Sequence, residues 1–434
     1  MNTRFLRYVF QNVAAMIGVS VYILADTFFI SLYGGANGIA FLNLVLPVYG
    51  LIFAIGAMIG VGSATRFTIK RAAGADSDFY FLQSVFWSLI ASIPFILLGI
   101  FSPDSVLRLM GADQVLTELG CAYTRIFLIF APFFMVNYTF TAFARNDNAP
   151  TIAMIGSISG SLFNIVFDYV LMFVLNLGLA GAAMATACSP LVTMAVCGMH
   201  YLGKKNGVGF RWVMPKLRFL RKSCGLGVSA FVGEMSSAVT TVVFNMLILH
   251  FAGNIGVAAY GIVANVSLVA MAIMNGIAQG TQPLLSECFG KSDKKQLASL
   301  LKHGLVAMLV AEVLIVGVIW LGTDGLIAVF NTEQSFELHE YAFGGLRLYF
   351  LGFLIVGINV MLITFFAATN RPVQTLIGSL LRGVIAISIC AVVLAVLFGM
   401  TGIWCSLLAS EIVTLAVLMI LYRRQKKRCE RRKK

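Results

Sequence analysis

Residues 21–30 read VYILADTFFI and residues 164–171 read NIVFDYVL, so two long apolar segments each contain one aspartate, Asp26 or Asp168. An ionised carboxylate near the centre of a bilayer costs roughly 2.5–3.5 kcal/mol on insertion scales. A chain that retains two such groups is expected to use them. The expected use is a cation or proton site on a transport path.

The composition around these segments is that of a membrane protein. Of the 434 residues, 59% are hydrophobic and only 11% are charged, whereas soluble proteins carry about 25% charged residues. Apolar runs of about 20 residues recur and can cross the hydrocarbon core as helices; they lack the alternation of β-barrel strands. The sequence predicts an all-α membrane protein with twelve transmembrane helices. The predicted spans are 8–32, 40–64, 81–101, 121–143, 153–175, 181–203, 226–250, 257–282, 301–323, 342–368, 374–398 and 401–422.

The basic residues predict the orientation of these spans. If the N-terminus lies inside, the inner loops and the two termini hold all 31 Lys and Arg residues except Arg108, Arg125, Arg347 and Arg382. Because cytoplasmic loops carry an excess of Lys and Arg, both termini are predicted to be cytoplasmic. The basic tail is expected to anchor the chain at that face, where it can also touch anionic lipid.

Several function classes are disfavoured by the same features. The net charge of +13 is dispersed along one membrane face, which argues against nucleic-acid binding. The loops are too short for a soluble catalytic domain, and no nucleophile–base pair or His-rich motif is present, so an enzyme is not expected. The eight cysteines lack a Cys-x-x-Cys pair and predict neither a disulfide framework nor a zinc site.

An internal repeat divides the chain into two halves. Residues 38–40 (GIA) match 256–258 (GVA), 148–150 (NAP) match 370–372 (NRP), and 155–157 match 377–379 (both IGS). Two halves of six spans start on the same side of the membrane, so they are parallel repeats, as in transporters that rock about a midplane site. A duplicated scaffold without transport is the alternative. The predicted domains are an N-lobe (1–210), a basic cytoplasmic linker (211–225), a C-lobe (226–422) and a basic tail (423–434).

Four oxygen-bearing side chains are predicted to share one depth in the N-terminal half. Asn164 and Asp168 lie one turn apart on one helix face, and Asp26 and Thr186 lie at a similar distance from the outer ends of their spans. Hard cations prefer such oxygens, and the small residues around Ala182 would let a backbone carbonyl approach. Two carboxylates in a low dielectric cannot both keep their charge cheaply, so the site can exchange a proton for Na⁺. A buried network that only fixes helix packing is the alternative.

Other polar residues within the spans are assigned less specific roles. Glu234 is a separate candidate for binding a proton or a cationic substrate, and Cys390 replaces the second aspartate in the C-terminal half. Glu312 and Glu411 have no evident partner in the sequence. Arg382 is a candidate to offset Glu411, although their estimated depths differ by several residues. Asn137 and Asn359, at equivalent places in the fourth and tenth spans, are predicted either to line a central path or to bridge helices. Gln279 and Gln282 are further candidates for the path, in a part of span 8 whose glycine and proline predict a bent helix.

Over nearly its whole length the sequence resembles the multidrug and toxic compound extrusion (MATE) family, and most closely its MepA-like and DinF-like bacterial exporters. The resemblance rests on residues 22–30 (YILADTFFI), 144–150 (ARNDNAP) and 276–283 (GIAQGTQP) followed by Gly290. It implies two six-helix lobes forming a V, alternating access, and antiport of amphipathic, often cationic, compounds against Na⁺ or H⁺. It also implies an N-lobe cation site made by Asp26, Asn164, Asp168 and Thr186, completed by the backbone carbonyl of Ala182, and it matches Glu234 to an acid of helix 7.

The resemblance further implies a monomer in the bacterial inner (plasma) membrane that needs no cofactor besides its coupling ion. Two departures stand out. The chain has no acid between Glu340 and Glu411, where some members carry an aspartate of a C-lobe cation site, and span 1 lacks the proline that bends helix 1 in some relatives.

Three other functions remain open from the sequence. A lipid-linked precursor flippase of a related fold would need a large cationic cavity, and the few intramembrane arginines argue against one. An embedded membrane enzyme lacks a catalytic motif here, and a channel does not account for the two-lobe repeat.

Overall fold

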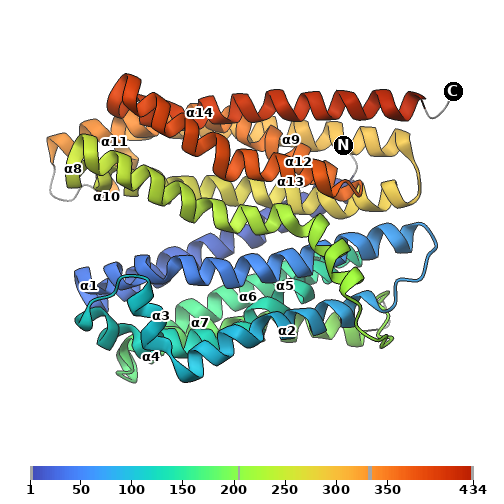
Figure 1. The fold of residues 1–434 in the computed structure, drawn as a ribbon, viewed down its shortest axis with the longest axis horizontal. Helices are drawn as coiled ribbons and strands as arrows, with labels where there is room; N and C mark the ends of the chain where they lie inside the picture. Colours follow the sequence, from blue (N-terminus) through green and yellow to red (C-terminus); the bar gives the residue numbers. More distant parts are fainter. Residues whose placement is uncertain (1–2, 204–205, 331–334, 432–434) are drawn as a thin grey trace.

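A computed structural model of the chain describes residues 3–203, 206–330 and 335–431, and these residues form helices and connecting loops without a strand (Figure 1). The helices of the first half are α1 (Thr3–Ala72), α2 (Tyr80–Phe101), α3 (Pro103–Leu109), α4 (Gln114–Ile129), α5 (Ala131–Asn146), α6 (Pro150–Tyr169), the π-helix η1 (Val170–Val174) and α7 (Gly178–Leu202). Those of the second half are α8 (Leu217–Gly290), α9 (Lys294–Leu321), α10 (Thr323–Phe330), α11 (Phe336–Tyr349), the 3₁₀-helix η2 (Phe350–Gly352), α12 (Phe353–Ala368), α13 (Pro372–Leu380), the π-helix η3 (Leu381–Ile385) and α14 (Ala386–Arg431).

Three of these helices reverse direction at a glycine. At 1.5 Å per residue, the 70 residues of α1 would otherwise extend for about 105 Å. Gly35 in α1, Gly253 in α8 and Gly399 in α14 have φ between 53° and 59°. Residues that have a Cβ atom rarely adopt this backbone conformation, whereas glycine adopts it readily. Each glycine therefore marks a tight turn between two antiparallel spans.

A second glycine follows each turn three residues later. Gly38 faces Ile30 across the first turn, and a Cβ at Gly402 would collide with the carbonyl oxygen of Leu394 across the last. The same Gly-x-x-Gly spacing occurs where η1 leads into α7, with φ of 55° at Gly178. The pattern thus recurs at four equivalent hairpins, and we call the end of the bundle that holds them the hairpin end.

The number of spans agrees with the prediction. Nine described helices are long and apolar enough to cross a membrane, and α4 with α5 forms a further span bent by 47°. Two of the nine, Leu217–Gly290 and Pro372–Arg424, contain one of the glycine turns and therefore cross twice. The predicted all-α fold with twelve spans is confirmed.

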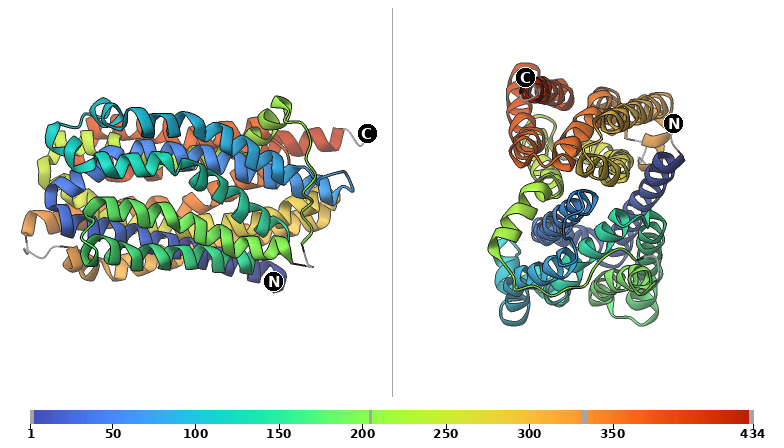
Figure 2. Two further views of the ribbon diagram at one scale, coloured as in Figure 1. Left: turned by 90° about the horizontal axis from the view of Figure 1, so that it is seen from below. Right: turned by 90° about the vertical axis from the view of Figure 1, so that its right-hand side faces the viewer.

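The spans form two lobes. In Figure 1 the helices α1–α7 lie in the lower layer and α8–α14 in the upper layer, and the end-on view in Figure 2 shows the same separation. We refer to these layers as the N-lobe and the C-lobe. Helices α1 and α8 provide most of the contact between them. Both chain termini lie at the same end of the bundle, which we call the terminal end.

The two lobes repeat local irregularities as well as helices. Asn148 and Asn370 have φ of 62° and 57°, and each stands two residues before the proline that begins a helix, Pro150 or Pro372. The fourth span of each lobe is also broken near its middle, at Phe130 in the N-lobe and at η2 in the C-lobe. The repeat in the sequence is therefore a repeat of backbone geometry.

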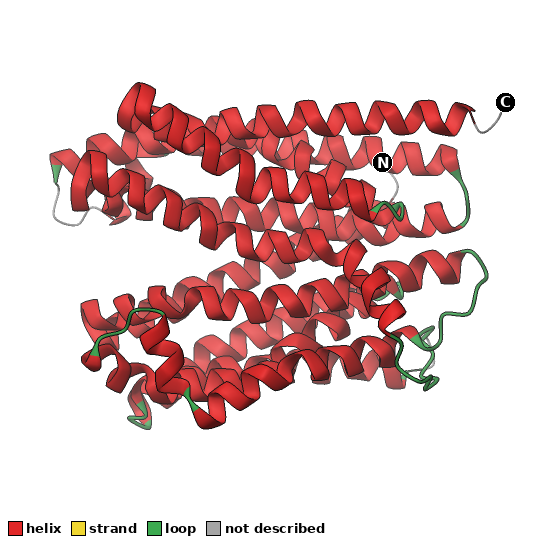
Figure 3. Cartoon of the chain, in the orientation of Figure 1, coloured by secondary structure: helices red, strands yellow, loops and turns green. Residues whose placement is uncertain are grey.

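Figure 3 shows loops at both ends of the bundle, and the segment between the lobes is bound to the N-lobe at the terminal end. The backbone N–H of Gly207 donates to Asp147 (2.8 Å), and Arg211 forms an ion pair with Asp76. Helix α8 begins at Leu217, inside the range predicted as a linker, and α14 continues to Arg431 through most of the predicted tail. Lys204, Lys205 and residues 432–434 of the predicted basic regions lie outside the described residues.

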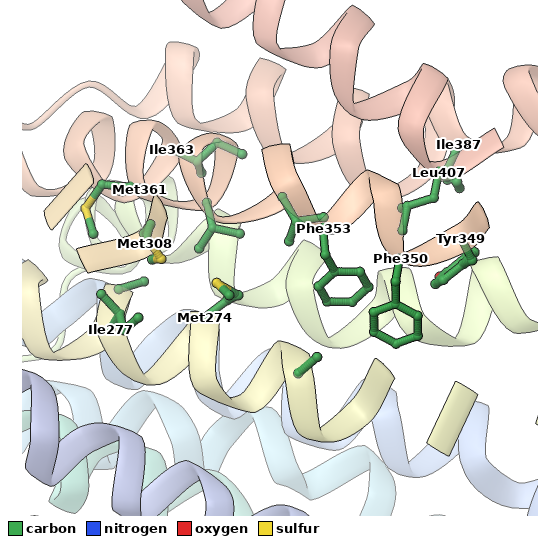
Figure 4. Close-up of a cluster of buried hydrophobic side chains, with 14 of the residues drawn as sticks. Met274, Ile277, Met308, Tyr349, Phe350, Phe353, Met361, Ile363, Ile387 and Leu407 are labelled. Carbon is green, nitrogen blue, oxygen red and sulfur yellow. The ribbon is translucent and has the colours of Figure 1, made fainter. Parts of the chain in front are cut away.

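Each lobe has its own apolar core. Figure 4 shows part of the C-lobe core, where Met274 of α8 and Met308 of α9 lie near Phe353 of α12. Phe5 and Tyr8, at the start of α1, belong to this C-lobe core rather than to the cores of the N-lobe. The first turns of the chain therefore join the two lobes at the terminal end.

Candidate functional site

Three N-lobe helices bring the predicted cation-site residues together. Helix α6 packs against both α1 and α7. It carries Asn164 and Asp168 one turn apart, while Asp26 lies on the first arm of α1 and Thr186 on α7. Asn164 and Asp168 have no exposed surface, and Thr186 is 8% exposed. The four side chains that were grouped by depth in the sequence form one buried cluster.

The hydrogen bonds of this cluster leave several oxygens without a donor. Asn164 Nδ2 donates to Thr186 Oγ1 at 3.1 Å. The carboxyl groups of Asp26 and Asp168 lie close enough to share a hydrogen bond, but only if one of them carries a proton. As carboxylates they have no donor, and Asp26 Oδ1, Asn164 Oδ1 and both oxygens of Asp168 are buried without a partner. Buried acceptors are normally satisfied, so this cluster calls for a proton or a cation.

The donor set fits a hard monovalent cation. Carboxylate, amide and hydroxyl oxygens are the ligands that such ions prefer, and the two acids supply the negative charge that would hold the ion. If Na⁺ binds, Asp26, Asn164, Asp168 and Thr186 would hold it. Ala182 is fully buried at the start of α7, and the role of its carbonyl stays a prediction.

The backbone next to the cluster is irregular. The π-helix η1 begins two residues after Asp168, and π-helical turns frequently occur at functional sites. Gly181 lies against the backbone of Leu171, so α7 begins in direct contact with η1. A side chain at that position would separate α6 from α7 and move Thr186 away from Asn164.

Two tyrosines near the cluster were not predicted from the sequence. Tyr22 lies one turn before Asp26 and is within electrostatic range of Asp26, Asp168 and Glu234. Tyr123 of α4 is in hydrogen-bonding contact with Thr186. The spacing of four residues between Tyr22 and Asp26 was a signal for the first, because i and i+4 share a helix face. No sequence feature pointed to Tyr123.

Glu234 lies between the lobes rather than in the N-lobe cluster. Its Oε1 accepts a hydrogen bond from the Tyr138 hydroxyl at 3.2 Å, which links α8 of the C-lobe to α5 of the N-lobe. Asn137 precedes this tyrosine, and its Oδ1 is buried without a donor. These residues lie where a substrate path between the lobes would run.

The other amides bridge helices, which was the predicted alternative for Asn359 but was not predicted for the two glutamines. Gln282 of α8 donates to Thr65 of α1 at 2.5 Å, and Gln279 of α8 contacts the sulfur of Met16 at 3.6 Å. Asn359 is fully buried within the C-lobe, where its Nδ2 donates to Glu411 Oε2 at 2.6 Å. The four predicted path amides therefore do not gather at one place.

Glu312 and Glu411, which had no evident partner in the sequence, each have one in the structure. Arg382 Nε lies 2.9 Å from Glu411 Oε1, so this candidate pair forms despite the difference in depth estimated by counting residues. Glu312 Oε1 accepts from the backbone N–H groups of Gly357 (2.6 Å) and Ile358 (3.2 Å). Long side chains and a π-helical segment at Arg382 bridge the difference that residue counting suggested.

The two lobes are closed against each other at the terminal end. Gly62 of α1 packs on the backbone of Ser223 in α8, and Gly280 of α8 packs on Tyr8 of α1. Arg4 and Glu287 add an ion pair of 2.7 Å across the same junction. Backbone-to-backbone contact of this kind leaves no passage between α1 and α8 at that end.

Comparison with known proteins gives a consistent result. The sequence profile of the MatE family matches residues 13–170 and 230–401. The multidrug export proteins MepA of Staphylococcus saprophyticus and Staphylococcus aureus are 28% and 27% identical to this chain, over 93% of it and 89% of their own length. Among solved structures, the outward-facing conformation of a multidrug resistance MATE family transporter of the MOP superfamily has a TM-score of 0.91 at 21% identity, covering 99% of this chain and 96% of that one.

Proposed function

Because the chain belongs to the MatE family of membrane transporters, we propose that it is a cation-coupled antiporter that exports amphipathic, often cationic, organic compounds. The observation that carries the proposal is the set of buried, unpartnered oxygens on Asp26, Asn164 and Asp168. A purely structural network would satisfy these acceptors. A site that exchanges H⁺ or Na⁺ during each cycle has to leave them available.

The coupling follows from charge. Two adjacent carboxylates repel each other in a low dielectric, and a proton or Na⁺ relieves that repulsion. Loading the cluster therefore favours a compact arrangement of α1, α6 and α7, and unloading favours a looser one. A ligand shifts such an equilibrium only by its difference in affinity for the two arrangements. Binding of H⁺ or Na⁺ makes the net charge of the two carboxylates less negative than −2, and the compact arrangement gains most from this change.

Alternating access is the proposed way in which this change reaches the substrate. The terminal end is closed by glycine-mediated contacts between α1 and α8. Asp26 lies on the first arm of α1, which also carries Tyr8, on which Gly280 of α8 packs, so a change in the packing of this arm acts directly on one of the closing contacts. We assign the terminal end to the cytoplasm, because the basic residues cluster there, and we place the protein in a bacterial plasma membrane as a monomer.

Substrate export is supported by the names of the MepA relatives, which are multidrug export proteins. Glu234 supplies an acid between the lobes for a cationic substrate or a proton. The flippase alternative is weaker, since a lipid pyrophosphate needs free cations. Arg382 is paired with Glu411, and the guanidinium of Arg347 stacks 4.3 Å from the ring of Phe343.

The test is efflux from proteoliposomes containing the purified protein, with Na⁺ and H⁺ gradients imposed separately. A fluorescent amphipathic cation serves as the substrate. One of the two gradients is expected to drive export, and Asp26→Asn and Asp168→Asn are each expected to abolish it. Glu118→Gln, a change at an exposed acid of α4, is the matched control and keeps wild-type efflux. Full gradient-driven efflux by either aspartate variant would overturn the proposal.

A further inference from the structure

A second cluster of ionisable groups lies in the C-lobe, far in sequence from the N-lobe aspartates. Glu312 of α9 and Glu411 of α14 are 0% and 2% exposed, and Asn359 of α12 is 0% exposed. Arg382, from η3, completes the group with a side chain that is 15% exposed. Four different segments of the C-lobe thus contribute one polar side chain each to its interior.

The two glutamates of this cluster are not equivalent. Both oxygens of the Glu411 carboxylate are engaged, one by Arg382 at 2.9 Å and the other by Asn359 Nδ2 at 2.6 Å. Glu312 uses only Oε1, which accepts from two backbone N–H groups of α12. Its Oε2 is buried without a partner. Arg382 therefore balances the charge of Glu411, and nothing in the described part of the cluster balances that of Glu312.

The surroundings of Glu312 make an unbalanced charge unfavourable. A Cβ at Gly357 would lie 2.8 Å from Glu312 Oε1, 2.9 Å from Met274 Sδ and 3.0 Å from Met308 Sδ. Only glycine lets the carboxyl group reach the helix backbone here, and two thioethers line the pocket. Thioethers donate no hydrogen bond, so these two neighbours of the carboxyl group cannot stabilise an anion.

The neighbouring ionisable groups do not supply the missing charge. Glu411 of α14 lies within electrostatic range of Glu312, and it is negative. Tyr349 of α11 faces Glu411 and Arg382, and Tyr260 of α8 faces Tyr349. On α9 itself, His303 lies about two and a half turns away at 3.6 residues per turn. The excess charge is therefore negative, and Glu312 carries it.

We infer that Glu312 is a second proton-binding site of the protein, in the C-lobe, and that it is loaded in the closed arrangement seen here. The proton sits on Oε2. Oε2 is the carboxyl oxygen of Glu312 that is buried without a partner. A metal cation needs more oxygen ligands than one carboxyl group supplies.

The location of Glu312 connects its proton to helix geometry. Its backbone partners Gly357 and Ile358 lie in α12, five and six residues after the break η2 ends at Gly352, and Arg382 lies in the π-helix η3. Breaks of this kind often mark hinges. Loss of the proton leaves a bare carboxylate beside Met274 and Met308, which favours movement of α9 away from α12.

This inference rests on the proposed transport cycle but is tested independently of it. Infrared spectra of the purified full-length protein report the C=O stretch of protonated carboxyl groups. A band that persists at neutral pH is expected in the double variant Asp26→Asn/Asp168→Asn, whose N-lobe cluster no longer holds an acid, and it is expected to disappear when Glu312→Gln is added to that double variant. Glutamine keeps the Oε1 acceptor and resembles the neutral acid, so the variant is expected to fold. Glu118→Gln is the control and leaves the band unchanged.

Transport separates a proton site from a structural role. In proteoliposomes, Glu312→Gln is expected to lower the number of protons exchanged per substrate exported and to flatten the dependence of export on pH. A neutral-pH band that persists when Glu312→Gln is added to the Asp26→Asn/Asp168→Asn variant would overturn the inference, as would loss of that band with an unchanged proton stoichiometry in Glu312→Gln. If the wild type exports nothing under either gradient, the proposed function fails, whereas the infrared result still decides the state of Glu312.

Discussion

Replacing Gly62 by alanine is expected to open the terminal end of the protein. A Cβ at this position would collide with the carbonyl oxygen of Ser223 and lie 2.8 Å from the backbone nitrogen of Gly227. Both obstacles are backbone atoms of α8, so no side chain can rotate away. The contact is relieved only if α1 and α8 separate, which moves the N-lobe away from the C-lobe.

The expected size of the effect comes from the cost of overpacking. An added methyl group in a well-packed contact costs about 1–3 kcal/mol, which corresponds to a shift of roughly 5–150-fold in the closed-to-open ratio. The Arg4–Glu287 pair across the same junction has side chains that are 44% and 23% exposed. Exposed pairs contribute about 0.2–1 kcal/mol, so the glycine contact outweighs the ion pair.

The measurement is the distance between spin labels at Ala75 in the N-lobe and Lys294 in the C-lobe, both exposed at the terminal end. Double electron–electron resonance, in a background with the native cysteines replaced, should show a longer or broader distribution for Gly62→Ala. Gly50→Ala is the matched control on α1, because no atom lies within 4 Å of its added Cβ. Identical distributions for the two variants would refute the assignment of Gly62 to the closure.

Three further outcomes follow from single contacts. Arg382→Ala leaves Glu411 buried without its counter-ion and is expected to cost about 3–5 kcal/mol, measured as a lower unfolding temperature in detergent. Gly178→Ala forces a Cβ into the left-handed region at a cost of roughly 1–2 kcal/mol, which is expected to lower the unfolding temperature by less. Thr186→Val removes the acceptor for Asn164 Nδ2, and the coupling-ion concentration for half-maximal efflux is expected to rise several-fold in the proteoliposome assay.

These outcomes have internal controls. Glu411→Gln in the Arg382→Ala background removes the uncompensated charge and should restore part of the stability. Gly198→Ala, with open space around its Cβ, should leave the unfolding temperature unchanged. Thr186→Ser keeps the hydroxyl and should keep wild-type coupling. The reasoning would be contradicted if Arg382→Ala and its double variant with Glu411→Gln lost equal stability, or if Gly178→Ala and Gly198→Ala did. It would also be contradicted if Thr186→Val kept the wild-type dependence of efflux on the coupling ion.

The sequence predicted the spans because hydrophobic length is nearly sufficient to define a membrane helix. It also predicted the pairing of the halves, since the repeated residues include Asn148 and Asn370, which adopt the same left-handed backbone. The turns at the glycine hairpins were not predicted, although the sequence contains a pattern for them. The four Gly-x-x-Gly sequences at Gly35, Gly178 and their C-lobe equivalents were a readable signal for tight turns between spans.

The grouping of the four N-lobe residues was predictable because they all lie in the outer part of their spans, where even the π-helix η1 after Asp168 changes the residue count little. Counting residues from a span end then estimates depth well. The pairing of Arg382 with Glu411 was disfavoured by residue counting for two physical reasons. Residue counting assumes an α-helical rise, whereas Arg382 lies in a π-helix. It also treats side chains as points, whereas an arginine and a glutamate together reach across more than a turn.

The two lobes differ in charge more than in shape, and this difference constrains the transport cycle. Asp26 and Asp168 form an acid pair without a counter-ion in contact, so the N-lobe cluster carries an excess of two negative charges when empty. Arg382 reduces the corresponding excess in the C-lobe to one, on Glu312. An empty N-lobe cluster is therefore the more strained of the two, and it should capture a cation first. The double variant Arg382→Ala/Glu411→Gln leaves one unbalanced negative charge in the C-lobe cluster, whereas Arg382→Ala alone leaves two. Only Arg382→Ala alone should therefore make the C-lobe compete with the N-lobe for the coupling ion.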